Sequence, residues 1–430
     1  MRIINLDENT KKNIQSNLLK RSPNQYDDYQ DIVNDILKDV KTRQDEAVFE
    51  YTKKFDKADI NASNIRVTKE EIEEAYSKFD KKLIDVIRKA IINIKEFHAR
   101  QEQQSWFYTK PNGILLGQKV SPIENVGVYV PGGKAAYPSS VLMNVIPALV
   151  AGVPRIVMTT PPDQDGKVYE GTLVAAAEAG VEEIYKVGGA QAIGALAYGT
   201  ESITKVDKIV GPGNIYVTLA KKAVFGSVSI DSIAGPSEIL IIADDTANPK
   251  YVAADLLSQA EHDELASSIL ITTSRELAYK VSEEVDEFIK KLSRSEIMKK
   301  SLDNFGYILI AETMDEAIDT ANEIASEHLE IMTEDPNLIM TKIKNAGAIF
   351  LGPYSSEPLG DYFAGPNHVL PTNGTAKFFS PLSVDDFIKK SSIISYSKEA
   401  LEPVYKDIVE FANAEGLTAH ANSVAVRFED

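Results

Sequence analysis

The chain has no cysteine among its 430 residues. Disulfides, thiolate nucleophiles and thiolate metal sites are therefore excluded, and imidazole and carboxylate groups remain as the strong ligands for a transition metal. Histidine is scarce as well, with five in the whole sequence. A site that needs an imidazole must draw on these five residues.

Long apolar runs and an excess of basic residues are also missing. No segment approaches the roughly 20 apolar residues of a transmembrane helix, and Met1 to Ser16 lacks the apolar core of a secretory signal. The formal net charge of −18 would repel a phosphate backbone or an anionic membrane surface. We therefore expect a cytoplasmic protein without nucleic-acid or membrane partners.

From residue 125 onward, short apolar segments alternate with helical segments, a pattern typical of parallel sheets with right-handed crossovers. The first hundred residues have helical periodicity instead, and Thr68 with Glu71 forms a capping-box pattern. The expected strands fall into two sets, 126–130, 155–159, 183–187 and 207–210, then 238–242, 268–273, 307–311 and 348–351.

These two sets predict two α/β domains with additional terminal segments. We expect an N-terminal helical arm and a helical C-terminal tail. The early helices are assigned to the second set of strands, which makes that domain discontinuous. The predicted boundaries are 1–25 for the arm, 26–122 plus 236–380 for the discontinuous domain, 123–235 for the domain with a glycine-rich edge, and 381–430 for the C-terminal segment.

Four of the five histidines follow residue 260, and each lies in a short polar cluster, which points to one composite site with a metal and an acid–base pair. Gln259 and His262 are three residues apart and share one face of a predicted helix. Alone, this spacing is more typical of a helix cap or surface histidine. A neutral Gln ligand also requires a carboxylate from elsewhere, and Asp361 is a candidate.

The other polar clusters have competing interpretations too. Glu327 and His328 end a predicted helix and can supply two bases of different strength, although such a position is typical of a histidine at a helix C-terminus. Asp361 and His368 lie in a segment interrupted by glycine and proline, which predicts a structured loop. His420 follows a predicted helix end at Gly416, where a surface histidine is the default.

Glycine turns after the strands of the first set suggest a ligand-binding edge, because open α/β sheets bind ligands at the carboxyl ends of their strands. These turns are Gly188-Gly189 and Gly211-Pro212-Gly213, with Pro131-Gly132-Gly133 before them. The sequence has no G-x-G-x-x-G fingerprint, so the turns alone leave dinucleotide binding open.

Taken together, eight segments in order resemble the histidinol dehydrogenase family. The resemblance extends from the early helices to the C-terminus. The matching segments are Val128 to Gly133, Val187 to Ile193, Val210 to Asn214, Ala234 to Glu238, Gln259 to His262, Ser326 to Glu330, Gly360 to His368 and Glu415 to His420.

The resemblance implies two three-layer α/β/α domains with mostly parallel sheets, incomplete Rossmann-like and aldehyde-dehydrogenase-like. It implies a homodimer with shared active sites that oxidises L-histidinol to L-histidine through the aldehyde, with two NAD⁺ and one Zn²⁺ per subunit. Carried over by position, the zinc ligands are Gln259, His262, Asp361 and His420, and the catalytic pair is Glu327 and His328. The NAD contacts are Tyr129, Gln191 and Asn214, and the substrate contacts are the zinc ligands with Ser237, His328, His368 and Glu415.

Two other functions fit the same residues. A zinc-dependent hydrolase with Glu327 as base uses the histidine clusters equally well, but it leaves the glycine edge without a role. A metal- or amino-acid-binding protein with two α/β lobes needs no chemistry at all. Production of NADH from histidinol separates the three interpretations.

Overall fold

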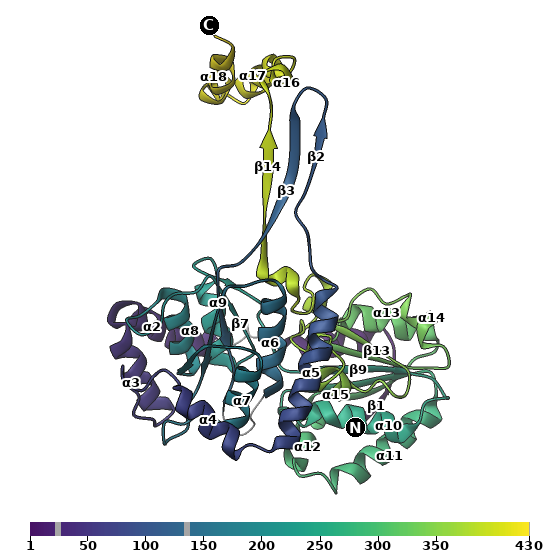
Figure 1. Ribbon diagram of the computed structural model, residues 1–430. Helices are drawn as coiled ribbons and strands as arrows, with labels where there is room; N and C mark the ends of the chain where they lie inside the picture. The colour runs from purple at the N-terminus through teal and green to yellow at the C-terminus, as the bar shows by residue number, and fades with distance from the viewer. Residues whose placement is uncertain (22–26, 133–137, 430) are drawn as a thin grey trace. The chain divides into compact units, whose positions relative to one another are not determined.

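The computed structural model describes residues 1–21, 27–132 and 138–429, and Figure 1 shows the chain. The chain divides into two compact units, one formed by Met1–Gln101 with Ile123–Phe387 and the other by Glu102–Pro122 with Ile388–Asp430. Both α/β sheets lie in the first unit. The predicted boundary after residue 25 and the predicted edge residue Gly133 lie outside the described residues.

The first α/β sheet is parallel throughout, with strand order β6-β5-β4-β7-β8. Its central strands are buried on both faces, as expected for a parallel sheet covered by helices. The strands are β4 (Asn125–Tyr129), β5 (Arg155–Thr160), β6 (Glu183–Lys186), β7 (Lys208–Val210) and β8 (Ser229–Ile230). One face packs against α4 (Lys69–Lys78), α5 (Lys81–Ala99), α6 (Pro138–Val150) and α7 (Glu170–Glu178), and the other against α2 (Asp27–Arg43), α3 (Asp45–Phe55), α8 (Gly189–Tyr198) and α9 (Ile215–Val224).

The second sheet is also parallel, with strand order β1-β11-β10-β9-β12-β13. Its strands are β1 (Arg2–Asn5), β9 (Glu238–Ala243), β10 (Ser267–Thr272), β11 (Gly306–Ile310), β12 (His328–Met332) and β13 (Ala348–Leu351). One face packs against α10 (Pro249–Ala260), α11 (Arg275–Ile289) and α12 (Ser295–Phe305), and the other against α1 (Glu8–Leu19), α13 (Met314–Ile324) and α14 (Pro336–Met340). The predicted α/β class with mostly parallel sheets is confirmed.

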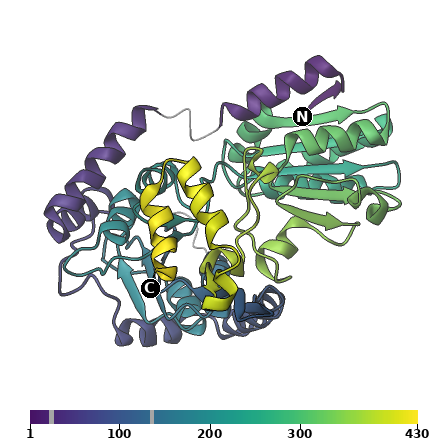
Figure 2. The ribbon, with the colours of Figure 1, turned by 90° about the horizontal axis from the view of Figure 1, so that it is seen from above.

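The early helices pack differently from our assignment. Val33 and Val40 of α2 and Ile87 and Ile94 of α5 lie in the cores around the five-stranded sheet, whereas we had placed them with the second set of strands. Figure 2 shows these purple and blue helices around the teal strands. The predicted capping box is confirmed, because Thr68 and Glu71 exchange backbone-to-side-chain hydrogen bonds of 2.9 and 3.3 Å.

The predicted N-terminal arm begins with a strand that sequence periodicity did not indicate. β1 pairs with β11 at the edge of the six-stranded sheet, with Ile3 opposite Ile308, and only then does helix α1 follow (Figure 2). Four residues are too few to show a strand period, so pairing with the buried strand β11 decides the structure here.

The second unit is built around an antiparallel sheet of three strands in the order β14-β3-β2. The strands are β2 (Trp106–Lys110), β3 (Ile114–Pro122) and β14 (Ile388–Ser395), and the helices are α16 (Lys398–Leu401), α17 (Tyr405–Ala414) and α18 (Thr418–Ala425). The predicted helical tail is therefore preceded by a strand. Trp106, Phe107 and Tyr108 of β2 are exposed. No helix within the described residues is both long and apolar enough to cross a membrane.

Candidate active site

Glu327 and His328 lie where helix α13 gives way to strand β12. Ala325 adopts the left-handed conformation with φ 54° and ends the helix, and His328 is the first residue of the strand, opposite Ile239 of β9 and Ala348 of β13. We expected the pair at the end of a longer helix. The left-handed turn instead brings the two adjacent side chains together at the amino-terminal edge of the sheet, where both are buried.

The main chain of Glu238 holds this pair. Its N–H donates to Oε2 of Glu327 at 2.8 Å, and its carbonyl oxygen lies 3.0 Å from Nδ1 of His328. A carbonyl oxygen only accepts, so Nδ1 carries a hydrogen and donates it. In the neutral imidazole, the lone pair is therefore at Nε2, which is buried without a hydrogen-bond partner among the described residues.

The buried pair has strongly shifted proton affinities. Burial raises the pKa of Glu327 to about 8, although the nearby His328 opposes this. Burial acts to lower the pKa of His328, but the charges of Glu327 and Asp361 outweigh it and raise the pKa to about 10. Perturbed groups of this kind cluster at catalytic sites. A carboxylate with a raised pKa is a stronger base than one in water.

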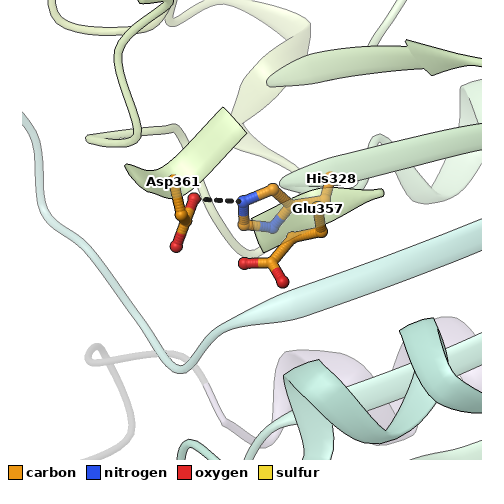
Figure 3. Close-up of side chains that lie close together, drawn as sticks. All are labelled: His328, Glu357 and Asp361. Carbon is orange, nitrogen blue, oxygen red and sulfur yellow. Dashed lines mark ion pairs between the residues drawn. The ribbon is translucent and has the colours of Figure 1, made fainter. Parts of the chain in front are cut away.

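Two carboxylates from the short helix α15 (Glu357–Tyr362) approach the imidazole of His328 (Figure 3). Oδ1 of Asp361 is 3.5 Å from Nε2, and one ligand atom from each of His328, Glu357 and Asp361 lies within 4.8 Å of the others. His328 helps to lower the pKa of Asp361 to about 2 against the opposing effect of burial. We expected Asp361 in a loop and did not identify Glu357, but their i,i+4 spacing puts both on one helix face.

Glu357 belongs to a group of buried carboxylates that also includes Glu330 and Asp255. Its N–H donates to Oε1 of Glu330 at 2.9 Å, and Ser258 donates to its Oε2 at 3.0 Å. Burial raises the pKa of Glu357 to about 8 and that of Asp255 to about 6, and it raises the pKa of Glu330 well above its usual value. Buried carboxylates without cations remain protonated or attract a metal.

Two further imidazoles surround Asp361. Nδ1 of His368 lies 3.1 Å from the Asp361 carbonyl oxygen, and the Asp361 charge acts on the pKa of both His368 and His262. Burial lowers the pKa of both histidines, which favours the neutral form that binds metals. Gln259, at the end of α10, is buried, and its Oε1 has no hydrogen-bond partner among the described residues.

The donor set in this unit fits a divalent transition metal. An unpartnered buried amide oxygen, two neutral imidazoles and an ionised carboxylate are the groups that such an ion takes from a protein without cysteine. Of the predicted ligands, the structure brings Gln259, His262 and Asp361 into this unit. His420 and the predicted substrate contact Glu415 are exposed in the second unit, on α18 and at the end of α17. Ser237 is partly exposed immediately before β9.

A separate cavity of about 1310 Å³ opens at the carboxyl edge of the five-stranded sheet. The predicted NAD contacts Tyr129, Gln191 and Asn214 all line it. Tyr129 is the last residue of β4, and Gln191 and Asn214 follow β6 and β7. Asn214 caps α9 by accepting from the N–H groups of Tyr216 and Val217. Nε2 of Gln191 is buried without a hydrogen-bond partner among the described residues and is thus able to donate to a ligand.

The turns that shape this cavity leave no room for side chains. A Cβ on Gly188 would lie 2.5 Å from Cβ of Pro161, and one on Gly211 would lie 2.1 Å from the Tyr129 carbonyl oxygen. The N–H of Gly189 donates to the hydroxyl of Tyr129 at 3.1 Å, which ties the turn after β6 to the end of β4. Main chain and the N-termini of α8 and α9 therefore form this edge, an arrangement that suits a pyrophosphate.

Comparisons with known proteins agree with this architecture. A model of the histidinol dehydrogenase family matches residues 19–428. Histidinol dehydrogenase from Bacillus subtilis is 61% identical over 395 residues, which is 92% of each chain. That from Clostridium acetobutylicum is 60% identical over 394 residues, covering 92% of this chain and 91% of the relative. The crystal structure of histidinol dehydrogenase from Elizabethkingia anophelis has a TM-score of 0.93 at 41% identity, covering 100% of this chain and 98% of that one. This chain is therefore a member of the histidinol dehydrogenase family and, with it, an oxidoreductase.

Proposed function

We propose that this chain oxidises L-histidinol to L-histidine through the aldehyde, with two NAD⁺, in the histidine biosynthesis of the cytoplasm. The observation that carries the proposal is the buried pair of Glu327 and His328, both held by the main chain of Glu238 beside the donors around Asp361. The choice of substrate rests on family membership, and the assignment of the acid–base chemistry rests on the arrangement of the pair.

His328 is the base of the alcohol oxidation in this proposal. Because Nδ1 donates to the Glu238 carbonyl, the hydroxyl proton of histidinol is accepted at Nε2. The carbon then loses a hydride to the nicotinamide, which leaves the aldehyde, one NADH and one proton. The carbonyl of Glu238 prevents the ring from turning and keeps Nε2 directed toward the substrate.

Glu327 has its role in the aldehyde oxidation. The aldehyde must first add water, because a carbonyl carbon without the added oxygen cannot give up a second hydride to form a carboxylate. The raised pKa of Glu327 makes its carboxylate able to take a proton from that water. His328 accepts the hydroxyl proton of the hydrate, and a second hydride leaves for the second NAD⁺.

Gln259, His262 and Asp361 would hold Zn²⁺, with His420 as the fourth ligand. When bound, the ion would orient the imidazole and amine of the substrate and would offset the charge of Asp361, which together with Glu327 raises the pKa of His328. The unpartnered Oε1 of Gln259 and the neutral state of His262 support this set. Glu357 is not one of these ligands. One donor atom from each of Glu357, His328 and Asp361 lies within 4.8 Å of the others, so these three residues form a second set of donors that shares Asp361.

His420 and Glu415 enter the site from a second copy of the chain in this proposal. Hybrid dimers test it. A His328→Asn protomer and a His420→Asn protomer are each expected to be inactive alone, but mixing them regenerates one intact site in each hybrid dimer. Activity should return toward a quarter of the native value, and its absence in demonstrated hybrids would exclude shared sites.

The direct test is incubation of the full-length chain with L-histidinol, Zn²⁺ and NAD⁺ while the absorbance of reduced nicotinamide is followed. We expect two NADH for each histidinol consumed. A hydrolase would give no NADH, and a binding protein would bind histidinol without consuming it. Either result would reject the proposal.

A further inference from the structure

Asp56 is a carboxylate in the wall of the cavity on the five-stranded sheet. It follows the last residue of α3, and its N–H donates to the Thr52 carbonyl oxygen at 2.9 Å. Ala58 and Ile60, just beyond it, are buried in the core beneath the cavity and fix the course of the chain. Asp56 thus faces the same space as Tyr129 and Gln191 from a rigid position.

One oxygen of this carboxylate has no hydrogen-bond partner among the described residues. Its Oδ2 is buried and has no hydrogen bond from any described residue, and burial raises the pKa of Asp56 to about 6. The two lysines of the cavity wall are engaged elsewhere. Nζ of Lys54 lies 5.4 Å from the ring centroid of Phe55, and Nζ of Lys167 is 3.3 Å from Oε1 of Glu74. A buried carboxylate oxygen without a donor is unfavourable, so a ligand with hydroxyl donors would stabilise it.

The surroundings of Asp56 favour one part of a dinucleotide. Phe55 and Tyr169 both line the cavity and are each 49% exposed, and Pro161 and Pro162 line it with them. Exposed rings and prolines suit an adenine base, whereas the helix N-termini after β6 and β7 suit the pyrophosphate. With the adenine against Phe55, its ribose lies next to the following residue, Asp56.

We propose that Asp56 accepts hydrogen bonds from the 2′ and 3′ hydroxyls of the adenosine ribose and thereby selects NAD⁺ over NADP⁺. The inference rests on the proposed use of NAD⁺. A ribose diol offers two donors to one carboxylate, while a 2′-phosphate removes a donor and places two negative charges against an anion. The chain has no G-x-G-x-x-G turn, yet Asp56 performs the task that an acidic residue performs in proteins with that motif.

The test measures binding of reduced nucleotides to the full-length chain without histidinol, by nicotinamide fluorescence or calorimetry. The native protein should prefer NADH to NADPH. Asp56→Asn should weaken NADH and reduce the preference by about tenfold to hundredfold, as expected for loss of a hydrogen bond to a charged group. Asp163→Asn, at a carboxylate that also lines the cavity, is the matched control. Because Asp163 Oδ1 accepts from its own loop, that preference should stay unchanged.

A ligand modification makes the test independent of folding. 2′-Deoxy-NADH should bind the native protein about tenfold or more weakly than NADH, and Asp56→Asn should remove most of that difference, as in a double-mutant cycle. Equal binding of NADH and 2′-deoxy-NADH by the native protein would overturn the assignment of Asp56, as would an unchanged preference in Asp56→Asn. If the native protein binds neither NADH nor NADPH, the proposed function fails instead.

Discussion

The two parallel sheets of this protein place the residues of their proposed sites at opposite ends of the strands. In the five-stranded sheet, the cavity residues Tyr129, Gln191 and Asn214 lie at or just after the carboxyl ends of strands. In the six-stranded sheet, His328 is the first residue of β12 and Ser237 directly precedes β9, so the proposed catalytic cluster lies at the amino ends of the strands. The same architecture thus supports two kinds of site.

Helix polarity explains the difference. At the carboxyl edge of the five-stranded sheet, α8 and α9 begin, and their N-terminal N–H groups favour an anion. At the amino edge of the six-stranded sheet, α10 and α13 end close to Gln259 and Glu327, and their carbonyl ends favour a cation. One edge is suited to a pyrophosphate, and the other to a metal ion and a protonated imidazole. Variants at the two edges should therefore fail in different ways.

The largest effect is expected for His328→Asn. Loss of the base should reduce histidinol oxidation by about 10²–10⁴-fold, the usual contribution of acid–base groups, while zinc content and NADH affinity stay native. Stopped-flow nicotinamide absorbance and metal analysis would measure both. His98→Gln, at a buried histidine on α5, is the control and should retain the native rate. Unchanged turnover in His328→Asn would exclude it as the base.

Glu327→Gln should separate the two oxidations. Gln retains an oxygen to accept from the Glu238 N–H, so the position of His328 is preserved. The alcohol step should remain close to native, but the aldehyde step should slow by about 10²-fold or more because no carboxylate activates the water. Single-turnover rates with histidinol and with the aldehyde would show this. Equal loss in both steps would contradict a role in hydration.

His262→Asn tests the cation edge directly. We expect the zinc content of the purified protein to fall by about tenfold or more, because one of three donors in this unit is weakened. NADH affinity should not change, since in our proposal the nucleotide binds at the carboxyl edge of the five-stranded sheet. Metal analysis of the variant after dialysis would measure its zinc content. A full zinc complement would show that His262 is not a zinc ligand.

The sequence predicted the sheets better than the interior of the site. Apolar segments such as 238–242 became the expected strands, because burial on both faces requires them to be apolar. We did not identify β12 because it carries two buried polar residues, His328 and Glu330, that interrupt its apolar pattern. We did not identify Glu357, Asp255 or Asp56 from the sequence for a related reason. An isolated carboxylate in a sequence is typical of a solvated surface, and only tertiary packing makes it buried and unpartnered.

Gln191→Ala tests the anion edge and should have a smaller effect. Removal of the unpartnered Nε2 donor should raise the KM for NAD⁺ by about tenfold, the value of one ligand hydrogen bond, with kcat and zinc content close to native. Gln164→Ala, at another glutamine of the cavity wall, is the matched control and should change the KM little because its side chain is exposed. A fall in kcat without a change in the KM for NAD⁺ in Gln191→Ala would contradict the proposal that the five-stranded edge serves only to bind the nucleotide.

The smallest effect concerns stability and again separates the sheets. Burial raises the pKa of Asp255 on α10 to about 6, whereas Arg155, the first residue of β5, lowers the pKa of Glu183. Between pH 4 and 6 the folded protein holds a proton on Asp255 that the unfolded chain has released, so this group costs stability as the pH rises through that window. Asp255→Asn removes this cost and should raise the thermal midpoint by a few degrees at pH 7, with a gain that shrinks toward pH 4.

Glu183→Gln should instead lower the thermal midpoint at pH 7, with a loss that shrinks toward pH 4, since it loses an ion pair that needs the ionised carboxylate. Thermal unfolding of both variants across this pH range would measure the contrast, and parallel curves for the two would show that burial and charge pairing do not distinguish the sheets.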